Sequence, residues 1–118
     1  MRSLILFITL CSLIQTTYAS PDFVCSLLHS KKVLKIAREH SGHDKNLHCT
    51  VSCMLALKCS DKEVLMIGVL KEIKDFFGTG TPSAEDLRAD AIGVELAATW
   101  SARSNEQCLS QCDLYFHQ

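Results

Sequence analysis

Six cysteines that follow residue 19 restrict the fold more than any other feature of this sequence. They are Cys25, Cys49, Cys53, Cys59, Cys108 and Cys112, while a seventh, Cys11, lies in the hydrophobic N-terminal stretch. An even number of cysteines in a short secreted chain indicates a disulfide framework. We therefore expect three disulfides, because a chain this small has a modest core and gains stability from covalent cross-links.

Two cysteine pairs have the spacing of neighbours on one side of a helix. Cys49 and Cys53 are four positions apart, as are Cys108 and Cys112, so both sulfurs of each pair face the same way on a helix. Two such helices packed antiparallel can be cross-linked twice. Zinc ligation is the alternative use of these cysteines, and we disfavour it because such zinc sites belong to reducing compartments. The expected pairing is Cys49–Cys112, Cys53–Cys108 and Cys25–Cys59.

The Cys49-x3-Cys53 spacing also resembles the second and third cysteines of insect odorant-binding proteins, which are secreted, helical and rich in disulfides. The last pair, Cys108 and Cys112, departs from the wider spacing that closes those chains. The resemblance is limited to one motif, and we assign no family from it.

Residues 1–19 have the organisation of a secretory signal peptide. Arg2 supplies a basic start, residues 4–14 are apolar, and Thr17 and Ala19 place small residues where cleavage before Ser20 would occur. The apolar run is shorter than the roughly 20 residues that cross a bilayer. We expect a secreted, extracellular protein in which residues 20–118 form a single disulfide-rich helical domain.

The remaining sequence predicts an all-α fold, a small bundle of four to five helices stapled by three disulfides. A first helix is expected to begin at Ser20 or soon after, and Ser60 and Ser83 are expected to cap two later helices. Residues 61–77 are apolar nearly all round, so this helix is expected at the centre of the bundle. The other helices are expected at 46–58, from 84 to about 102, and from 106 to about 115.

Acidic side chains fall where a helix would be expected to bury apolar residues. On a helical wheel, Asp86 and Asp90 lie between the two apolar stripes of the helix after Ser83. Glu72 and Asp75 lie close to the side of helix 61–77 that carries small and apolar residues. A buried carboxylate has to be paired or hydrogen-bonded, or its pKa rises.

Three uses of these acids remain open. In the first, which we favour, Asp86 is a first-turn helix acid and Asp90 pairs with a Lys, His or hydroxyl of a neighbouring helix. In the second, His48, Glu72, Asp75, Asp86 and Asp90 converge on calcium, magnesium or manganese. In the third, an acid and His48 form a hydrolytic acid–base pair. The sequence contains no Glu-x-x-His, G-x-S-x-G or H-E-x-x-H motif to support the last two.

Charge excludes two classes of function. The chain has 12 Lys and Arg against 13 Asp and Glu, a formal net charge of −1, which is unlike a nucleic-acid binder or a strongly cationic membrane-lytic peptide. We expect no nucleic-acid partner and no stable membrane insertion. The expected partner is an extracellular protein target or a small apolar ligand.

Size, signal peptide and disulfides together favour a secreted, toxin-like or humoral-defence effector that acts by binding an extracellular target. A carrier of a small hydrophobic ligand is one alternative, since 47% of the residues are hydrophobic. A metal-dependent hydrolase that uses the acid cluster is the other. The sequence assigns no catalytic residue and no cofactor, with a divalent cation as the candidate if one is bound.

Overall fold

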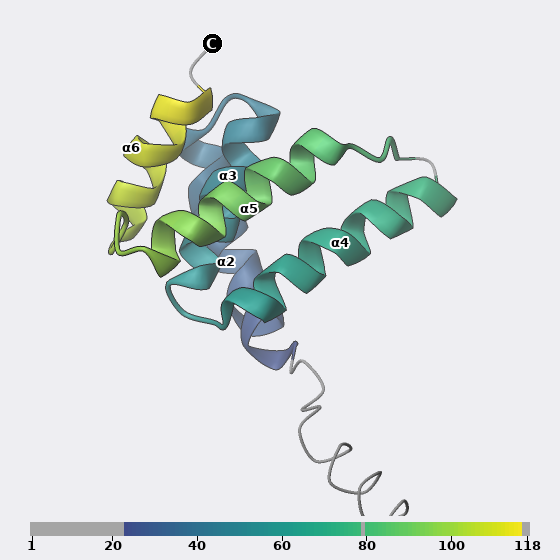
Figure 1. The fold of residues 1–118 in the computed structure, drawn as a ribbon, viewed down its shortest axis with the longest axis horizontal. Coiled ribbons are helices and arrows are strands. Elements are labelled where there is room, and N and C mark those ends of the chain that lie inside the picture. Colours follow the sequence, from purple (N-terminus) through teal and green to yellow (C-terminus); the bar gives the residue numbers. More distant parts are fainter. Residues whose placement is uncertain (1–22, 79, 117–118) are drawn as a thin grey trace, which may run out of the picture.

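The computed structural model describes residues 23–78 and 80–116, and five helices make up most of that part (Figure 1). The predicted signal peptide and Ser20, the earliest expected start of the first helix, lie outside the described residues. The described residues contain no strand, so the predicted all-α class is confirmed. The helices are α2 (Val24–His40), α3 (Asp44–Ala56), α4 (Asp61–Phe77), α5 (Ala84–Ala98) and α6 (Asn105–Phe116).

All three predicted disulfides are confirmed. Two of them, Cys49–Cys112 and Cys53–Cys108, join α3 to α6 and are fully buried. The third, Cys25–Cys59, joins the start of α2 to the segment that precedes α4. They connect positions 63, 55 and 34 residues apart, so each closes a long loop of the unfolded chain.

The central helix is α3, which packs against each of the other four helices. Its closest neighbour is α5, because Gly93 lets the two backbones meet. A Cβ atom placed on Gly93 would lie 2.2 Å from the carbonyl oxygen of Cys49. The core around this contact includes Met54, Ala89 and the four cysteines of the α3–α6 disulfides.

The prediction that helix 61–77 lies at the centre of the bundle is wrong, although its bounds match α4. The side of α4 that faces α5 and α2 carries Val64, Gly68 and two buried acids, Glu63 and Glu72. Seven large apolar side chains of α4 point to solvent, and each is between 37% and 82% exposed. We call them the outer face of α4: Leu65, Met66, Val69, Leu70, Ile73, Phe76 and Phe77.

Contacts at both ends of α4 explain this orientation. Near its start, Glu63 Oε1 accepts a 2.8 Å hydrogen bond from the backbone N–H of Ser26 in α2. Near its end, Glu72 Oε2 accepts a 2.6 Å bond from the backbone N–H of Ser83 before α5. Buried carboxylates have to satisfy such bonds, so these two acids hold their side of α4 inward.

Helix ends follow the expected caps in part. The Ser60 and Ser83 hydroxyls accept the backbone N–H groups of Glu63 and Asp86, as predicted. The expected extension of the fourth helix to about residue 102 is wrong, because α5 ends at Ala98. The chain reverses at Trp100, whose φ of 63° is left-handed and incompatible with a continuing helix.

Candidate functional site

A polar cluster lies between α3 and α5, with His48 at its centre. His48 Nδ1 is 3.1 Å from Asp90 Oδ1, and His48 Nε2 is 3.5 Å from Asp86 Oδ2. The Ser52 hydroxyl donates a 2.8 Å hydrogen bond to the same Asp90 oxygen. One turn of α3 thus supplies both the imidazole and the hydroxyl, since positions 48 and 52 share a helix side.

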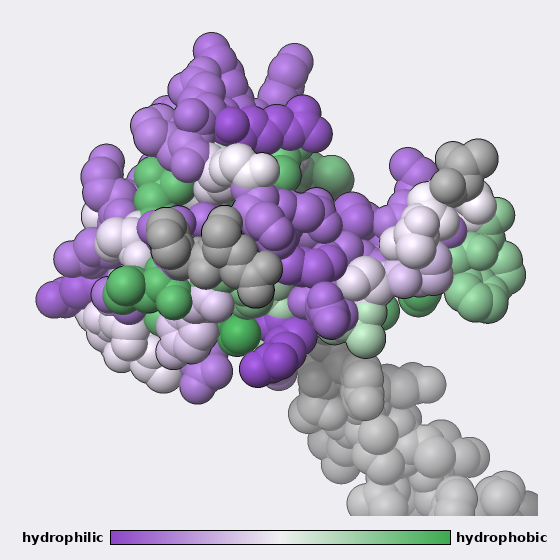
Figure 2. All heavy atoms as spheres, turned by 90° about the horizontal axis from the view of Figure 1, so that it is seen from above, coloured by the Kyte–Doolittle hydropathy of each residue, from purple (hydrophilic) through white to green (hydrophobic). Residues whose placement is uncertain are grey.

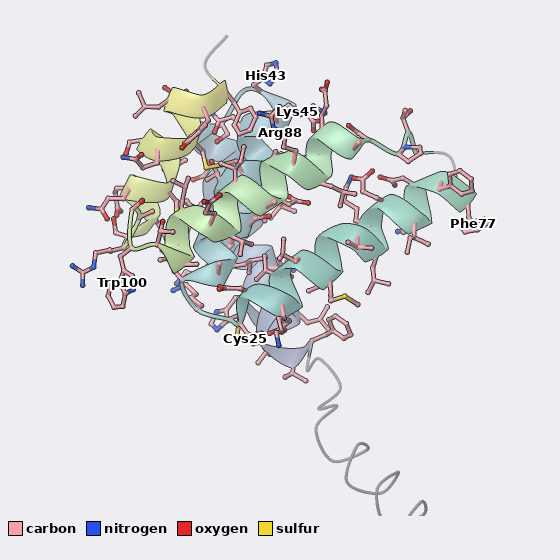
Figure 3. The ribbon with its side chains drawn as sticks, in the orientation of Figure 1. Cys25, His43, Lys45, Phe77, Arg88 and Trp100 are labelled. Atoms are coloured by element: carbon pink, nitrogen blue, oxygen red, sulfur yellow. A yellow bond between two sulfur atoms is a disulfide. The ribbon has the colours of Figure 1, made fainter. Side chains whose placement is uncertain are left out.

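Asp86 has a second cationic partner in Lys45, which forms an ion pair and a hydrogen bond with it. Lys45 Nζ also donates to the Ser83 hydroxyl at 3.3 Å. Figure 3 shows Lys45 on α3 beside the N-terminal half of α5. Asp86 is therefore both a first-turn acid of α5 and the point where α3 and α5 are joined by charge.

These contacts shift three pKa values. The hydrogen bond to Asp90 raises the pKa of His48 above 6.5, against the opposing effect of burial. The hydrogen bond to Asp86 raises the pKa of Lys45 in the same way. Burial alone would raise the pKa of Asp86, but the Lys45 hydrogen bond and the charges of His48 and Lys45 lower it. The contacts therefore favour the charged forms of His48, Lys45 and Asp86.

The five residues predicted as one cation site do not converge on one point. Glu72 and Asp75 pair with Lys71 at 3.4 Å and 2.9 Å, on the inner side of α4. Glu72 is linked to the cluster by hydrogen bonds through Ser83, whose backbone N–H donates to Glu72 and whose hydroxyl accepts from Lys45. His48, Asp86 and Asp90 do come together, in contacts of the kind that the polar-network hypothesis describes.

Two smaller groups among the described residues have the spacing of metal ligands. The first, Cys25, Cys59 and Glu63, is not available to a metal ion because its two cysteines form a disulfide. The second surrounds His48. Donor atoms of Asp44, His48 and Asp86 lie within 4.8 Å of one another. Lys45 already neutralises Asp86, and the Nδ1 atom of His48 already contacts Asp90. A divalent cation would have to displace the ammonium group and take a proton from the imidazole.

The cluster also lacks the alignment of a hydrolytic site. A serine nucleophile is activated when its hydroxyl contacts a general base. Here the Ser52 hydroxyl donates to Asp90, and the imidazole of His48 is oriented toward carboxylates on both of its nitrogens. The arrangement fits a structural network better than acid–base chemistry.

A cleft of about 350 Å³ opens beside the polar cluster, between α2, α3 and α4. His48, Asp90 and Lys71 line its polar side, and Arg38 of α2 and Asp44 of α3 also border it. Its apolar walls are Leu34, Leu47, Val51, Leu55, Val64 and Ile67.

The outer face of α4 is the second candidate site. The α4–α5 hairpin projects from the rest of the bundle (Figure 1), and Phe77 lies at its far end (Figure 3). Figure 2 shows hydrophobic atoms gathered at this projecting end. Monomeric soluble proteins rarely expose so many large apolar side chains on one surface, so this face has the character of a binding surface.

Several residues of these sites were not predicted from the sequence. Lys45, Ser52 and Ser83 complete the polar cluster, and Arg38 borders the cleft. A signal for Ser52 was present, because it lies four positions after His48 on the same stripe of α3. Nothing local in the sequence pairs Lys45 with Asp86, which are 41 positions apart.

Comparison with known proteins identifies no relative. No protein-family model, no curated protein and no solved structure matches this chain. None of the helices in residues 23–78 and 80–116 is long and apolar enough to cross a membrane. The three disulfides are compatible with an extracellular protein.

Proposed function

We propose that this protein is a secreted effector that binds an extracellular protein target through the outer face of α4. The observation that carries the proposal is the exposure of seven large apolar side chains along one side of this helix. Exposed apolar patches rimmed by polar residues mark interaction sites. Two separate carboxylate hydrogen bonds, Glu63 with Ser26 and Glu72 with Ser83, support the same conclusion, because they hold the inner side of α4 against its neighbours and leave the apolar side toward solvent.

The spacing of the outer face suits insertion of the helix into an apolar groove. Leu65, Val69 and Ile73 follow at intervals of four, and Met66, Leu70 and Phe77 form a neighbouring row. Helices that bind in grooves use anchors at i, i+3, i+4 and i+7. Full burial of an exposed large apolar side chain is worth roughly 1.5–3 kcal/mol before the costs of association. Leu65, Val69 and Ile73 are 37–49% exposed and would contribute a fraction of that amount each.

The helix is also presented in a fixed orientation. The Cys25–Cys59 disulfide lies immediately before α4, and the Glu72–Ser83 hydrogen bond holds its far end to the start of α5. A preorganised surface loses less conformational entropy when it binds. Aromatic and methionine side chains, which Phe76, Phe77 and Met66 supply, are enriched in interface cores.

Photo-crosslinking tests this proposal. A photoreactive amino acid replaces Ile73 in the oxidised protein, which is incubated with extracellular fluid and intact cells of the secreting tissue. We expect one discrete cross-linked protein that excess wild-type protein competes away. Leu70→Ser should compete poorly, because a serine removes apolar contact from the same face.

The matched control places the photoreactive residue at Glu95, which is exposed on α5. A protein that is cross-linked equally from Glu95 would show that capture is nonspecific. Recovery of only a second copy of this chain, or of lipid alone, would identify a dimer or a membrane surface as the occupant and would contradict the proposal.

A further inference from the structure

We propose that the cleft between α2, α3 and α4 binds a small amphiphile with a single anionic head group. The site lies on the cluster side of α4 and does not depend on the outer face. Its ligand would place an apolar tail against the inner walls and its head at Arg38. The proposal rests on the walls, the size and the charge of the cleft.

The walls and the size fit an aliphatic chain. Leu34, Leu47, Val51, Leu55, Val64 and Ile67 come from three helices and line one space of about 350 Å³. Pockets for small ligands are typically about 300–1,000 Å³ and mostly apolar, with a few polar groups that orient the ligand. A single medium-length aliphatic chain has the size and the apolar character that this cleft can hold.

Charge at the mouth selects an anion. Arg38 is exposed at the cleft, and its guanidinium makes no hydrogen bond or ion pair with any residue in 23–78 or 80–116. A guanidinium binds a carboxylate or a phosphate through two parallel hydrogen bonds. Lys71, the other cation of permanent charge in the lining, is already paired with Glu72 and Asp75.

The acids of the lining are compensated and would not favour a cationic head. Asp90 contacts His48 at 3.1 Å. The Asp44 carboxylate, 66% exposed, lies 3.6 Å from Lys45 Nζ and 4.0 Å from His48 Nε2. Arg38 is therefore the charged group of the lining that remains open to a ligand.

Calorimetric titration of the oxidised protein tests the proposal with four probes that share one tail. These are dodecanoate, dodecyl phosphate, dodecanol and dodecylammonium. The ionic probes are kept below their micelle concentrations and dodecanol below its solubility limit. We expect the two anions to bind at least about tenfold more tightly than dodecanol, as a charge-assisted hydrogen-bonded pair implies. The ratio between the two anions then distinguishes a carboxylate from a phosphate head. Dodecylammonium binding as tightly as dodecanoate would overturn the proposal.

Variants assign the head and the tail to their residues. Arg38→Ala should lower dodecanoate affinity about tenfold and leave dodecanol affinity unchanged, and Arg38→Lys should restore part of the loss. Lys32→Ala, an exposed cation of the same helix outside the cleft lining, is the matched control. An equal effect of Arg38→Ala and Lys32→Ala would exclude a head-group role for Arg38.

Filling the cleft should abolish binding of every probe. Ile67→Trp places a large ring in the space, and Val51→Phe is the second choice if circular dichroism shows that the first variant does not fold. Leu70→Ser changes only the outer face of α4 and should leave binding unaltered. Binding that survives a folded cleft-filling variant, or that is lost in Leu70→Ser, would place the amphiphile elsewhere.

Discussion

The Asp90 carboxylate of α5 occupies the space that a side chain on Gly68 of α4 would need. A Cβ atom on Gly68 would lie 2.6 Å from Asp90 Oδ2. The other oxygen of Asp90 is held by Ser52 and His48, so the carboxylate has little freedom to move. Because Gly68 has no side chain, α4 leaves room for the Asp90 carboxylate of α5.

Gly68→Ala is therefore expected to destabilise the protein by about 1–3 kcal/mol, the usual cost of overpacking. A destabilisation would point to the contact with Asp90, because replacing glycine by alanine in a helix interior otherwise stabilises a protein by about 1 kcal/mol. Urea unfolding of the oxidised protein measures the change.

Gly42→Ala is the matched control, since a Cβ atom there meets nothing within 4 Å. We expect it to change the unfolding free energy by less than about 1 kcal/mol. If Gly68→Ala proves as harmless as Gly42→Ala, Asp90 does not fill the space beside α4.

A second prediction concerns the attachment of α6. Replacing both Cys53 and Cys108 by alanine should lower the unfolding free energy by about 2–5 kcal/mol. The bond closes a 55-residue separation and is fully buried. Its loss gives the unfolded chain more conformational freedom and weakens the packing of α6 on α3. Hydrogen exchange is expected to accelerate most in α6.

The Cys25→Ala/Cys59→Ala variant is the comparison, because its bond closes a shorter, 34-residue separation and is only partly buried. Its faster exchange should appear at the start of α2 instead. Uniform acceleration in both variants would show that neither disulfide acts locally.

Local geometry made the disulfides predictable. Two cysteines four positions apart must face one side of a helix, so Cys49/Cys53 and Cys108/Cys112 could be paired from their spacing in the sequence. The caps at Ser60 and Ser83 were predictable for the same reason, since a cap depends on residues within one turn.

The orientation of α4 was not predictable in this way. A helix that is apolar nearly all round gives no pattern that says which side faces protein. That choice depends on distant partners: Ser26 for Glu63, and Ser83 for Glu72. The partner of Asp86 could not be predicted for the same reason, because Lys45 lies on another helix, 41 positions earlier in the sequence.

A third prediction concerns metal. Neither EDTA nor excess Mn²⁺ should shift the melting temperature of the wild-type protein, because Lys45 already neutralises Asp86. A ligand stabilises a protein only in proportion to its binding to the folded state. Differential scanning fluorimetry gives the readout.

Lys45→Met tests the reason for this expectation. This substitution should lower the free energy of unfolding by about 2 kcal/mol. Breaking a fully buried ion pair would lower it by more, but Lys45 is partly exposed. The substitution should also make the melting temperature sensitive to Mn²⁺, since Asp44, His48 and Asp86 then have an uncompensated charge. A higher melting temperature of the wild-type protein in Mn²⁺ would contradict this prediction and support a divalent-cation site at the acids around His48.

The final prediction is a stability maximum in mildly acidic solution. The pKa of His48 is raised in the folded state above its ordinary 6.5, so its contribution is complete below about pH 6.5 and is lost as pH rises through the folded pKa. The pKa of Asp86 is lowered below its ordinary 3.8, so its contribution is present above that pH and is lost as pH falls. Between these limits both groups stabilise the fold.

Urea unfolding at several pH values measures this dependence. Above about pH 6.5, the unfolding free energy of the wild-type protein should fall, because the imidazolium between Asp86 and Asp90 loses its proton as pH rises through the raised pKa of His48. His48→Gln should be less stable at pH 5.5 and should lose most of this decline. His43→Gln changes an exposed histidine and should keep the wild-type profile. Parallel profiles for wild type and His48→Gln would mean that the imidazole does not carry the charge that joins α3 to α5.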